Sequence, residues 1–432
     1  MAFKFNKIGR RFLRTLGTLV GLWIIFSIYY MTTWTKTSDR TQEPLTTTIS
    51  NPIYQSQITK AETYLKGVTK RLDVPSFSVA VGYKDQLIWS AAAGYQDVAL
   101  QKPATPQTQY RIGSTSKAVT ASGIARLVNA GKLDLDALVG DTIINWPQKK
   151  WNFSTRQLLS HTAGVGNYED FGVASLKYTI CNCHQFNSVT EGLNVFNDYE
   201  LLYEPGTAFQ YSTFDINLTS AVLEQAAQQD FLSYMDSQIF EPLGMTSTYA
   251  DHAKPKTEHF ATFYQTDGGY YREYRNFEIK YDVNLSYKWA GGGFISTPTD
   301  LVKLGNAWLN DPTFLSPETK EAFWTPMKLN NGEVNWQEYA LGWRSYLSHK
   351  SDILLNNEPI WMVHHGGVSK GSMNFLVIFP NYNLVIDASI NAHAAQFGYF
   401  AKEVQILANY FLEEIKKDAP PQDKDILNQH NL

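Results

Sequence analysis

The sequence predicts a mixed α/β fold in which one β-sheet is formed by both ends of a globular domain and a helical insert lies between them. Short apolar runs with strand character occur early, at 76–81 and 86–92, and again late, at 339–346, 374–379 and 384–390. Helical patterns dominate the chain between these two groups. Strands from distant parts of a chain that share one sheet place the intervening helices beside it, and the seam between sheet and insert is a natural site for a cleft.

The composition is that of a globular protein. Of 432 residues, 44% are hydrophobic and 18% are charged, which leaves enough apolar side chains for a large core. The formal net charge is −4 and no long basic run occurs beyond the N-terminus, so we expect no nucleic-acid partner. Cys181 and Cys183 stand too close in sequence for a disulfide framework, and no second ligand cluster accompanies them, so we expect neither a metal nor another cofactor.

The first element is a basic flank followed by an apolar run. Five Lys and Arg residues precede the run at 16–31, and no acidic residue occurs before Asp39. Residues 32–34 can extend the run to the length of a spanning helix, so residues 1–34 are interpreted as a basic cytoplasmic segment with a membrane anchor helix over about 16–34. The positive flank stays in the cytoplasm, which places the rest of the chain outside it, on the periplasmic side of a bacterial inner membrane.

Two other interpretations of this segment stay open. A cleaved signal peptide would need small residues at its cleavage site, whereas Met-Thr-Thr-Trp-Thr-Lys follows the apolar run. A mitochondrial presequence would also be Arg-rich and free of acids, but it would be amphipathic and less hydrophobic than this segment. We therefore expect an uncleaved anchor.

Composition also predicts where the linker, the globular domain and the C-terminal tail begin and end. Residues 35–55 are rich in Thr, Ser, Gln and Pro and are expected to form a linker. The domain is expected over 56–416, with the helical insert at about 132–290. Residues 417–432 are charged and contain two prolines, so we expect a flexible tail there.

Several helices are predicted within the domain. Residues 116–130 carry apolar side chains at helical spacing and are followed by Gly131, a plausible stop. The same spacing predicts helices over 213–228, 232–240 and 396–416. Turns are expected at 82–85 and 380–383, where each joins two neighbouring strands.

Ser114 and Lys117 are the first candidates for chemistry. A serine hydroxyl is a weak nucleophile at neutral pH and needs a base within hydrogen-bond reach. Positions i and i+3 lie on one face of a helix, so the predicted helix brings the Lys117 amine beside the Ser114 hydroxyl. Gly113 allows a tight turn, and free N–H groups at a helix N-terminus favour developing negative charge. Taken alone, Ser-x-x-Lys is also the pattern of an N-cap serine followed by an exposed lysine.

Two later stretches supply possible partners. Tyr-Ser-Thr (211–213) follows a Pro-Gly turn that brings Tyr211 to the start of a helix, where a nearby lysine ammonium can lower the tyrosine pKa and make it a base or proton shuttle. His-His-Gly-Gly (364–367) precedes a predicted strand, and Gly366 and Gly367 would let a ligand approach N–H groups that can hold an oxyanion. A buried structural tyrosine and an ordinary turn with exposed histidines are the alternatives.

The ordered set Ile-Gly-Ser-Thr-Ser-Lys (112–117), Tyr-Ser-Thr (211–213) and His-His-Gly-Gly (364–367) resembles the serine β-lactamase and penicillin-binding superfamily, most closely its class C-related hydrolases and esterases. Three connecting stretches agree with it: Leu-Leu-Ser-His-Thr-Ala-Gly (158–164), Glu-Pro-Leu-Gly-Met (241–245) and Trp-Ala-Gly-Gly-Gly-Phe-Ile-Ser-Thr (289–297). The last stretch is similar to the mitochondrial serine β-lactamase-like members. The resemblance spans about residues 58–415, and His161 within it is interpreted as structural.

The resemblance implies an antiparallel sheet flanked by helices, with an all-helical insert, and a set of roles. Ser114 would attack a carbonyl to form an acyl-enzyme, Lys117 would activate it, and Tyr211 would pass the proton to the leaving group. The backbone N–H groups of Ser114 and Gly367 would hold the oxyanion. We therefore expect a membrane-anchored serine hydrolase that cleaves an ester or amide bond of a small-molecule or peptide substrate.

Two positions depart from the β-lactamase pattern. Thr213 stands where many relatives have Asn, which removes an amide that both donates and accepts. His364, or His365 in an alternative register, stands where true β-lactamases have Lys, and a histidine is mostly neutral at pH 7. Antibiotic hydrolysis and D-Ala-D-Ala carboxypeptidase action, which need a cation for the substrate carboxylate, are therefore weaker alternatives. A catalytically weak scaffold that assembles into a homo-oligomer or filament is another.

Overall fold

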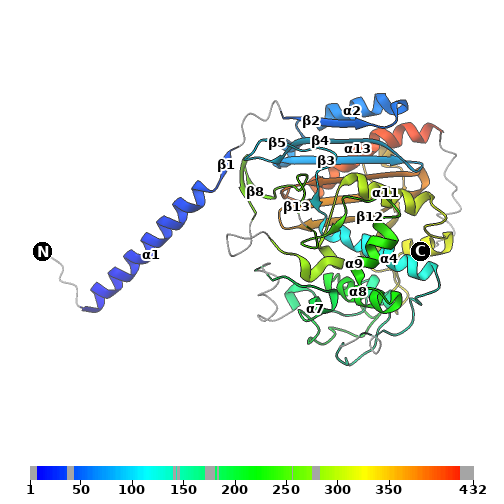
Figure 1. Ribbon diagram of the computed structural model, residues 1–432, viewed down its shortest axis with the longest axis horizontal. Helices are drawn as coiled ribbons and strands as arrows, with labels where there is room; N and C mark the ends of the chain where they lie inside the picture. The colour runs from blue at the N-terminus through cyan, green and yellow to red at the C-terminus, as the bar shows by residue number, and fades with distance from the viewer. Residues whose placement is uncertain are drawn as a thin grey trace.

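A computed structural model describes residues 7–36, 43–139, 143, 146–170, 181, 184–254, 256–274 and 283–418. Its centre is a large antiparallel sheet in strand order β11-β12-β13-β14-β3-β4-β2, with β5 paired to β4 (Figure 1). These strands are β2 (Leu45–Ile49), β3 (Ser76–Tyr83), β4 (Gln86–Asp97), β5 (Lys102–Pro103), β11 (Arg344–His349), β12 (Ile360–Ser369), β13 (Ser372–Phe379) and β14 (Leu384–Ile390). Because β14 pairs directly with β3, the sheet joins distant parts of the chain, as predicted.

The strand predictions differ from the structure mainly at β11 and β12. β14 has the predicted bounds, and β3, β4 and β13 extend the predicted ranges. β11 begins only at Arg344, because the residues before it form a tight turn in which the Ala340 N–H donates to the Trp343 carbonyl. Residues 364–367, predicted to precede a strand, lie inside β12, because the chain from Ile360 onward already pairs with β11.

Helices cover both faces of the sheet (Figure 1). α2 (Gln55–Leu65) and α13 (Phe397–Asp418) pack on one face, and α4 (Ser116–Asn129) and α11 (Pro298–Asn310) on the other. Leu384 and Ile386 of β14 belong to the apolar cluster with α2 and α13, whereas Val385 belongs to the cluster with α4 and α11. A strand that is buried on both faces carries apolar residues on both, as β14 does at five of its seven positions. The two buried polar residues, Asp387 and Ser389, both accept from the Asn374 side chain.

The segment between α4 and α11 is helical only in part. Its helices are α5 (Thr155–Leu159), α7 (Val189–Leu193), α8 (Thr213–Ala227), α9 (Phe231–Met235), the π-helical η5 (Asp236–Phe240) and α10 (Trp289–Gly292). It also contains β7 (Tyr249–Ala250) and a hairpin of β8 (Tyr264–Asp267) and β9 (Tyr270–Glu273), and β7 joins β6 (Tyr110–Arg111) and β10 (Phe294–Ser296) in a small sheet. The insert is therefore not all-helical: Gly268 and Gly269 both have positive φ and allow the hairpin turn.

Part of the expected linker belongs to the main sheet. Leu45–Ile49 forms β2, which pairs with β4 as an edge strand. Its threonines suit a strand, and Trp89 Nε1 donates to the Thr47 hydroxyl at 3.0 Å. β1 (Thr35–Lys36) pairs with β9. The rest of the linker at 37–42 and the expected tail beyond Asp418 lie outside the described residues.

The remaining short elements complete the domain. They are η2 (Pro52–Tyr54), α3 (Val68–Leu72), η3 (Gly113–Thr115), η4 (Tyr168–Asp170), η6 (Ser286–Lys288), α12 (Pro317–Trp324), η7 (Leu355–Asn357) and η8 (Pro380–Tyr382). Among them η3 matters most for function, because it carries Ser114 directly into α4.

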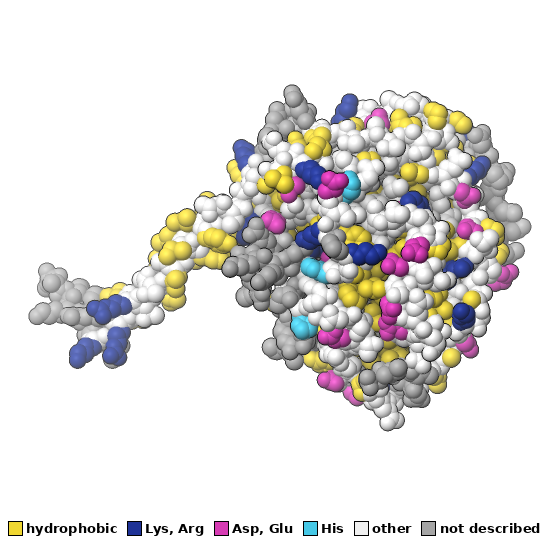
Figure 2. All heavy atoms as spheres, viewed as in Figure 1, with side chains coloured by type: hydrophobic (Ala, Val, Ile, Leu, Met, Phe, Trp, Pro, Cys, Tyr) yellow, Lys and Arg dark blue, Asp and Glu magenta, His cyan; other side chains and the backbone are white. Residues whose placement is uncertain are grey.

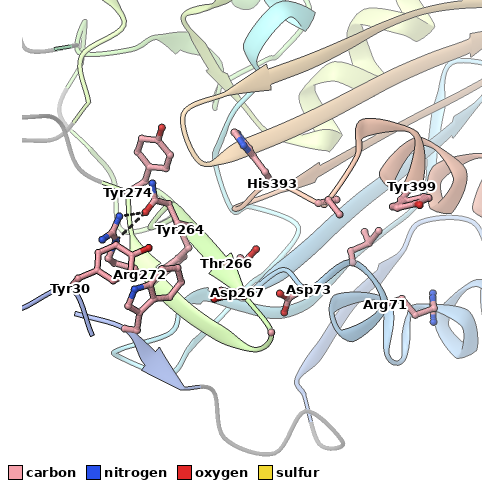
Figure 3. A pocket seen from close by; sticks show the side chains of 16 residues that line it. Tyr30, Arg71, Asp73, Tyr264, Thr266, Asp267, Arg272, Tyr274, His393 and Tyr399 are labelled. Atoms are coloured by element: carbon pink, nitrogen blue, oxygen red, sulfur yellow. Dashed lines mark hydrogen bonds between the residues drawn. The ribbon is translucent and has the colours of Figure 1, made fainter. Parts of the chain in front are cut away.

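α1 (Lys7–Thr32) projects from the domain, and Figure 2 shows hydrophobic side chains along it with Lys and Arg at its far end. The stretch Arg11–Thr32 is long and apolar enough to span a membrane, by length and composition. Near its domain end the Arg272 guanidinium lies 4.4 Å from the Tyr30 ring centroid and 5.4 Å from that of Trp34. These residues border an open hollow of about 810 Å³ (Figure 3), whose lining includes none of the predicted catalytic residues.

Candidate active site

Ser114 lies where the backbone of η3 meets strand β12. Gly113 has φ of 53°, and a Cβ there would come within 2.7 Å of the Val368 backbone. A Cβ on Gly367 would collide with the Ile112 carbonyl and lie 2.9 Å from Ser114 N. Only glycine at both positions allows this close approach. As a result, the Ser114 N–H and the Gly367–Val368 segment lie side by side, and Ser114 is partly exposed.

The Lys117 amine is the centre of the polar network. It is fully buried and donates to the Gly291 carbonyl at 2.6 Å, with Ser114 Oγ at 3.2 Å and Thr213 Oγ1 at 3.3 Å. The pKa of Lys117 is lowered to about 7, chiefly by burial; the charges of Lys288 and Arg344 also lower it, whereas Tyr168 and Asp215 raise it. The i, i+3 spacing therefore brings Ser114 and Lys117 together as predicted from the sequence.

Tyr211 reaches the same point from the start of α8. Ser212 is the N-cap, since its side chain accepts from the Phe214 N–H. This cap places Thr213 in the first turn against Lys117, and the Lys117 Nζ lies 4.8 Å from the Tyr211 ring centroid. Burial raises the pKa of Tyr211, and it outweighs the nearby Arg344 charge and the hydrogen bond with Ser114, which lower that pKa. The expectation of a lowered tyrosine pKa is therefore reversed, because desolvation disfavours the phenolate.

His161 lies directly behind Tyr211. The two ring centroids are 4.5 Å apart, and His161 Nδ1 is 2.9 Å from Asp215 Oδ2. Burial lowers the pKa of His161 well below its usual value and raises that of Asp215 well above its usual value. His161 is therefore neutral at pH 7 and burial disfavours the charged form of Asp215, and the Ser212 N–H, 3.3 Å from Nδ1, ties this pair to the Tyr211 backbone.

The two histidines of the third motif face opposite sides of the sheet. His365 lies on the Ser114 side: its Nε2 is 2.9 Å from the Tyr339 hydroxyl, and its carbonyl accepts from Thr115 Oγ1 at 3.2 Å. His364 lies on the other side, with its ring against those of Tyr346 and Phe375. In the structure, His365 rather than His364 occupies the position where true β-lactamases have Lys, and Gly367 lies beside it at the site. His364 lies away from the site. Gly366 also faces away, since a Cβ there would meet the Phe397 ring of α13.

Sequence reasoning missed several groups at the site. The Gly291 carbonyl, which holds Lys117, belongs to a stretch that the sequence offered only as part of a resemblance. Tyr339 and Arg344 come from the turn and strand just before β12, and the Arg344 guanidinium lies 5.4 Å from the Tyr211 ring centroid. Lys288 comes from η6. Tyr339 and Arg344 have no local sequence signature, because each is brought to the site by a distant part of the fold.

No cluster of three or more His, Cys, Asp or Glu side chains that could hold a metal is found within the part of the chain that the structure describes. Cys181 takes part in a disulfide, and Cys183 lies outside the described residues. The groups nearest Ser114 are the Lys117 amine, the Tyr211 hydroxyl and the backbone of the Gly367–Val368 segment.

Comparisons with known proteins agree with this geometry. A family model described as Beta-lactamase matches residues 61–404. The serine beta-lactamase-like protein LACTB, mitochondrial, of Homo sapiens is 29% identical over 395 residues, which cover 73% of this chain and 71% of that protein. The octameric penicillin-binding protein homologue from Pyrococcus abyssi has the same fold, with a TM-score of 0.67, 21% identity and coverage of 84% of this chain and 79% of that one. The hydrolase EstCE1, described as having promiscuous acyltransferase activity, has a TM-score of 0.68, 19% identity and coverage of 83% and 99%.

Proposed function

The chain belongs to the β-lactamase family, and on that premise we propose that it is a membrane-anchored serine hydrolase that forms an acyl-enzyme at Ser114. The observation that carries the proposal is the buried Lys117 amine, which lies 3.2 Å from Ser114 Oγ and has a pKa lowered to about 7. About half of an amine with this pKa is uncharged at neutral pH and can accept a proton.

Acylation follows from these positions. Lys117 takes the hydroxyl proton as Ser114 Oγ bonds to the substrate carbonyl carbon, and the π electrons of the carbonyl move onto its oxygen. The N–H groups of Ser114 and of the Gly367–Val368 segment stabilise this oxyanion. When the carbonyl re-forms, the bond to the leaving group breaks, and the leaving group takes the proton that Lys117 holds, relayed through the Tyr211 hydroxyl.

Deacylation uses the same groups with water as the nucleophile. As the water attacks the acyl carbonyl, one of its protons passes through the Tyr211 hydroxyl to Lys117. The proton returns to Ser114 Oγ when the ester bond to Ser114 breaks and the acid is released. Because burial raises the pKa of Tyr211, the phenol acts as a neutral relay between Lys117 and the exchanging oxygen, rather than as a tyrosinate base. Thr213 orients the Lys117 amine between these two steps.

The substrate is proposed to be a small molecule or peptide with an ester or amide bond. His365 occupies the third-motif position at the site, and burial lowers its pKa, so it is neutral at pH 7 and does not replace the lysine of true β-lactamases. β-Lactam or D-Ala-D-Ala hydrolysis is therefore secondary to esterase or peptidase action.

The anchor is proposed to keep the domain at a membrane surface. α1 would cross the membrane with its basic end on the cytoplasmic side of a bacterial inner membrane, and the domain on the periplasmic side. The exposed apolar side chains of Arg11–Thr32 support this arrangement. Alkaline carbonate extraction of cell membranes measures it: an anchored chain stays in the pellet, and a released chain contradicts the anchor.

A fluorophosphonate probe tests the proposed enzyme directly. The full chain in detergent is exposed to the probe, and its intact mass is measured beside that of Ser114→Ala. One adduct on the native protein that is absent from the variant supports an activated Ser114. No adduct over a range of pH values overturns the proposal, and the scaffold hypothesis, which the octameric assembly of the Pyrococcus abyssi homologue also motivates, then takes its place.

A further inference from the structure

The open hollow at the domain end of α1 lies where the chain would leave the membrane. α1 ends at Thr32, and β1 begins at Thr35 and pairs with β9 of the β8–β9 hairpin. This pairing holds the hairpin within a few residues of the end of the apolar helix. Tyr30 and Trp34, rings of the type that gather at membrane–water interfaces, line the hollow together with the hairpin (Figure 3).

Arg272 is the cation on the membrane side of this hollow. Its guanidinium lies 4.4 Å from the ring centroid of Tyr30 and 5.4 Å from that of Trp34, and its Nε donates to the neutral Gln265 side chain at 3.0 Å. Within the described ranges Arg272 forms no salt bridge with a carboxylate. The other arginine of the hollow, Arg71, is already paired with a carboxylate of α13 at 2.7 Å.

Two carboxylates lie at the opposite end of the same hairpin. Asp267 is two positions from Gln265, the β8 partner of Arg272, so the three side chains share one face and the two β8 positions are about 7 Å apart along the strand. Asp73 lies at this end too, because its Oδ1 accepts from the Gly269 N–H at 3.0 Å, and both carboxylates line the hollow (Figure 3). β1 runs toward this end as it leaves α1, so the carboxylates are farther from the membrane than Arg272.

We propose that the hollow binds the headgroup of a membrane phospholipid whose phosphate is followed by an ammonium group, with the phosphate on Arg272 and the ammonium at Asp267 and Asp73. The proposal rests on the proposed membrane anchor and deepens it, because it makes the β8–β9 hairpin a second contact with the bilayer.

The order of charges in the hollow matches the order of charges in such a lipid. The phosphate is attached to the glycerol, on the bilayer side, and the ammonium lies beyond it. A guanidinium binds a phosphate through charge-assisted hydrogen bonds, and the carboxylates attract the ammonium. The hollow, at about 810 Å³, is within the range of about 300–1,000 Å³ that small-molecule sites occupy.

Native mass spectrometry of the full chain in detergent tests the headgroup site. In every chain compared, the Lys and Arg residues of the N-terminal basic flank are replaced by Gln, because that flank would bind anionic lipids itself. The delipidated chain is mixed with equal amounts of phosphatidylethanolamine and phosphatidylglycerol that have identical acyl chains, and the intensities of the two 1:1 adducts are compared. The two lipids share the phosphate and differ in the ammonium, so we expect about 10-fold more of the phosphatidylethanolamine adduct.

Substitutions at the two ends of the hollow separate the two contacts. Arg272→Gln should lower both adducts about 10-fold, because it removes the charge-assisted contact with the phosphate, and Arg272→Lys should restore part of the loss. Asp267→Asn should lower only the phosphatidylethanolamine adduct and bring the ratio of the adducts toward one. Lys132→Gln removes a charge from an exposed position that does not line the hollow and should change neither adduct. Circular dichroism of each variant checks that it is folded.

Several outcomes would overturn the headgroup site. They are equal retention of the two lipids by the chain with an unaltered hollow, an Arg272→Gln chain that keeps both adducts, and a dimer that Arg272→Gln abolishes while no lipid adduct forms, since the hollow would then bind a second copy. Alkaline carbonate extraction tests the anchor separately. A chain that stays in the pellet but shows no lipid selectivity contradicts the headgroup site alone, whereas a released chain contradicts the anchor and the headgroup site with it.

Discussion

His364 and His365 are neighbours in β12, yet they face opposite sides of the sheet and meet different surroundings. On the Ser114 side, both ring nitrogens of His365 have partners: Nδ1 lies 2.8 Å from the Gly366 carbonyl, and Nε2 lies 2.9 Å from the Tyr339 hydroxyl. On the α13 side, neither ring nitrogen of His364 has a partner among the described groups, and the ring packs against Tyr346 and Phe375.

The comparison of His364 with His365 shows that burial and a shifted pKa do not by themselves mark a functional residue. Burial lowers the pKa of both histidines well below 6.5. What distinguishes the two faces is the polar network: on the Ser114 face, His365 is hydrogen-bonded to Tyr339 and Thr115 beside the nucleophile, whereas on the α13 face the ring nitrogens of His364 make no hydrogen bond among the described residues. Substitutions on the Ser114 face should therefore affect activity, and substitutions on the α13 face should affect stability.

The largest effect is expected on the Ser114 face for Lys117→Met. This change keeps the length and packing of the side chain but removes the base, so the rate of Ser114 labelling should fall by about 10³- to 10⁴-fold, the upper range for a positioned acid–base group. Thermal unfolding should change little or improve, because a buried amine is lost. Labelling of the variant within 10-fold of the native rate would contradict the role of Lys117.

Tyr211→Phe should have the next largest effect. It removes the relay hydroxyl and keeps the ring that packs on His161, so turnover should fall by about 10²-fold. We expect the loss to be larger in turnover of an ester than in a single labelling event, because deacylation needs the relay again. Equal losses in both assays would indicate that Tyr211 only shapes the site.

Some residues of the Ser114 face could be predicted from the sequence, and others could not. Helical spacing predicted that Ser114 and Lys117 share one face, and the family resemblance was needed to interpret them as a catalytic pair. The bounds of β14 were predicted from its strand-like sequence. Tyr211 could be joined to them only through the family resemblance, because Lys117 and Tyr211 are 94 positions apart in the sequence. The pattern His-His-Gly-Gly does not reveal which histidine faces the site, since that depends on the register of β12 with its neighbours. Arg344 has no local sequence signature.

The pH dependence of labelling is expected to follow the Lys117 amine. The reactive form is the free amine, and its pKa is lowered to about 7, so the rate should rise about tenfold per pH unit below 7 and level off above it. Arg344 lowers this pKa, so Arg344→Gln should move the midpoint to higher pH. A rate that is flat from pH 5 to 9 would exclude Lys117 as the base.

His365→Phe should have a larger effect on the free energy of unfolding than on the rate of Ser114 labelling. The change leaves the buried Tyr339 hydroxyl without its partner, which costs about 1–3 kcal/mol of unfolding free energy. Activity should fall only several-fold, because Tyr339 packs beside Tyr211 without touching Ser114 in any contact described. Urea unfolding measures the first effect and probe labelling the second.

The smallest effect, and the sharpest test of the comparison, is expected for His364→Leu on the opposite face. Leucine fills a similar space without the two unpartnered ring nitrogens, so the unfolding free energy should rise by about 1 kcal/mol, and labelling of Ser114 should stay at the native rate. Loss of stability, or a clear loss of labelling, would show that His364 belongs to the functional face after all.

The same substitution should also change the response to acid. Because burial lowers the pKa of folded His364 well below 6.5, the unfolded chain binds a proton below about pH 6.5 that the folded chain does not, so stability falls as the pH drops. His364→Leu removes that proton uptake, and its gain over the native chain should therefore grow between pH 7 and pH 5. His259→Leu, at an exposed histidine, serves as the control and should show no such growth. The gain should appear as a higher urea midpoint for His364→Leu at each pH.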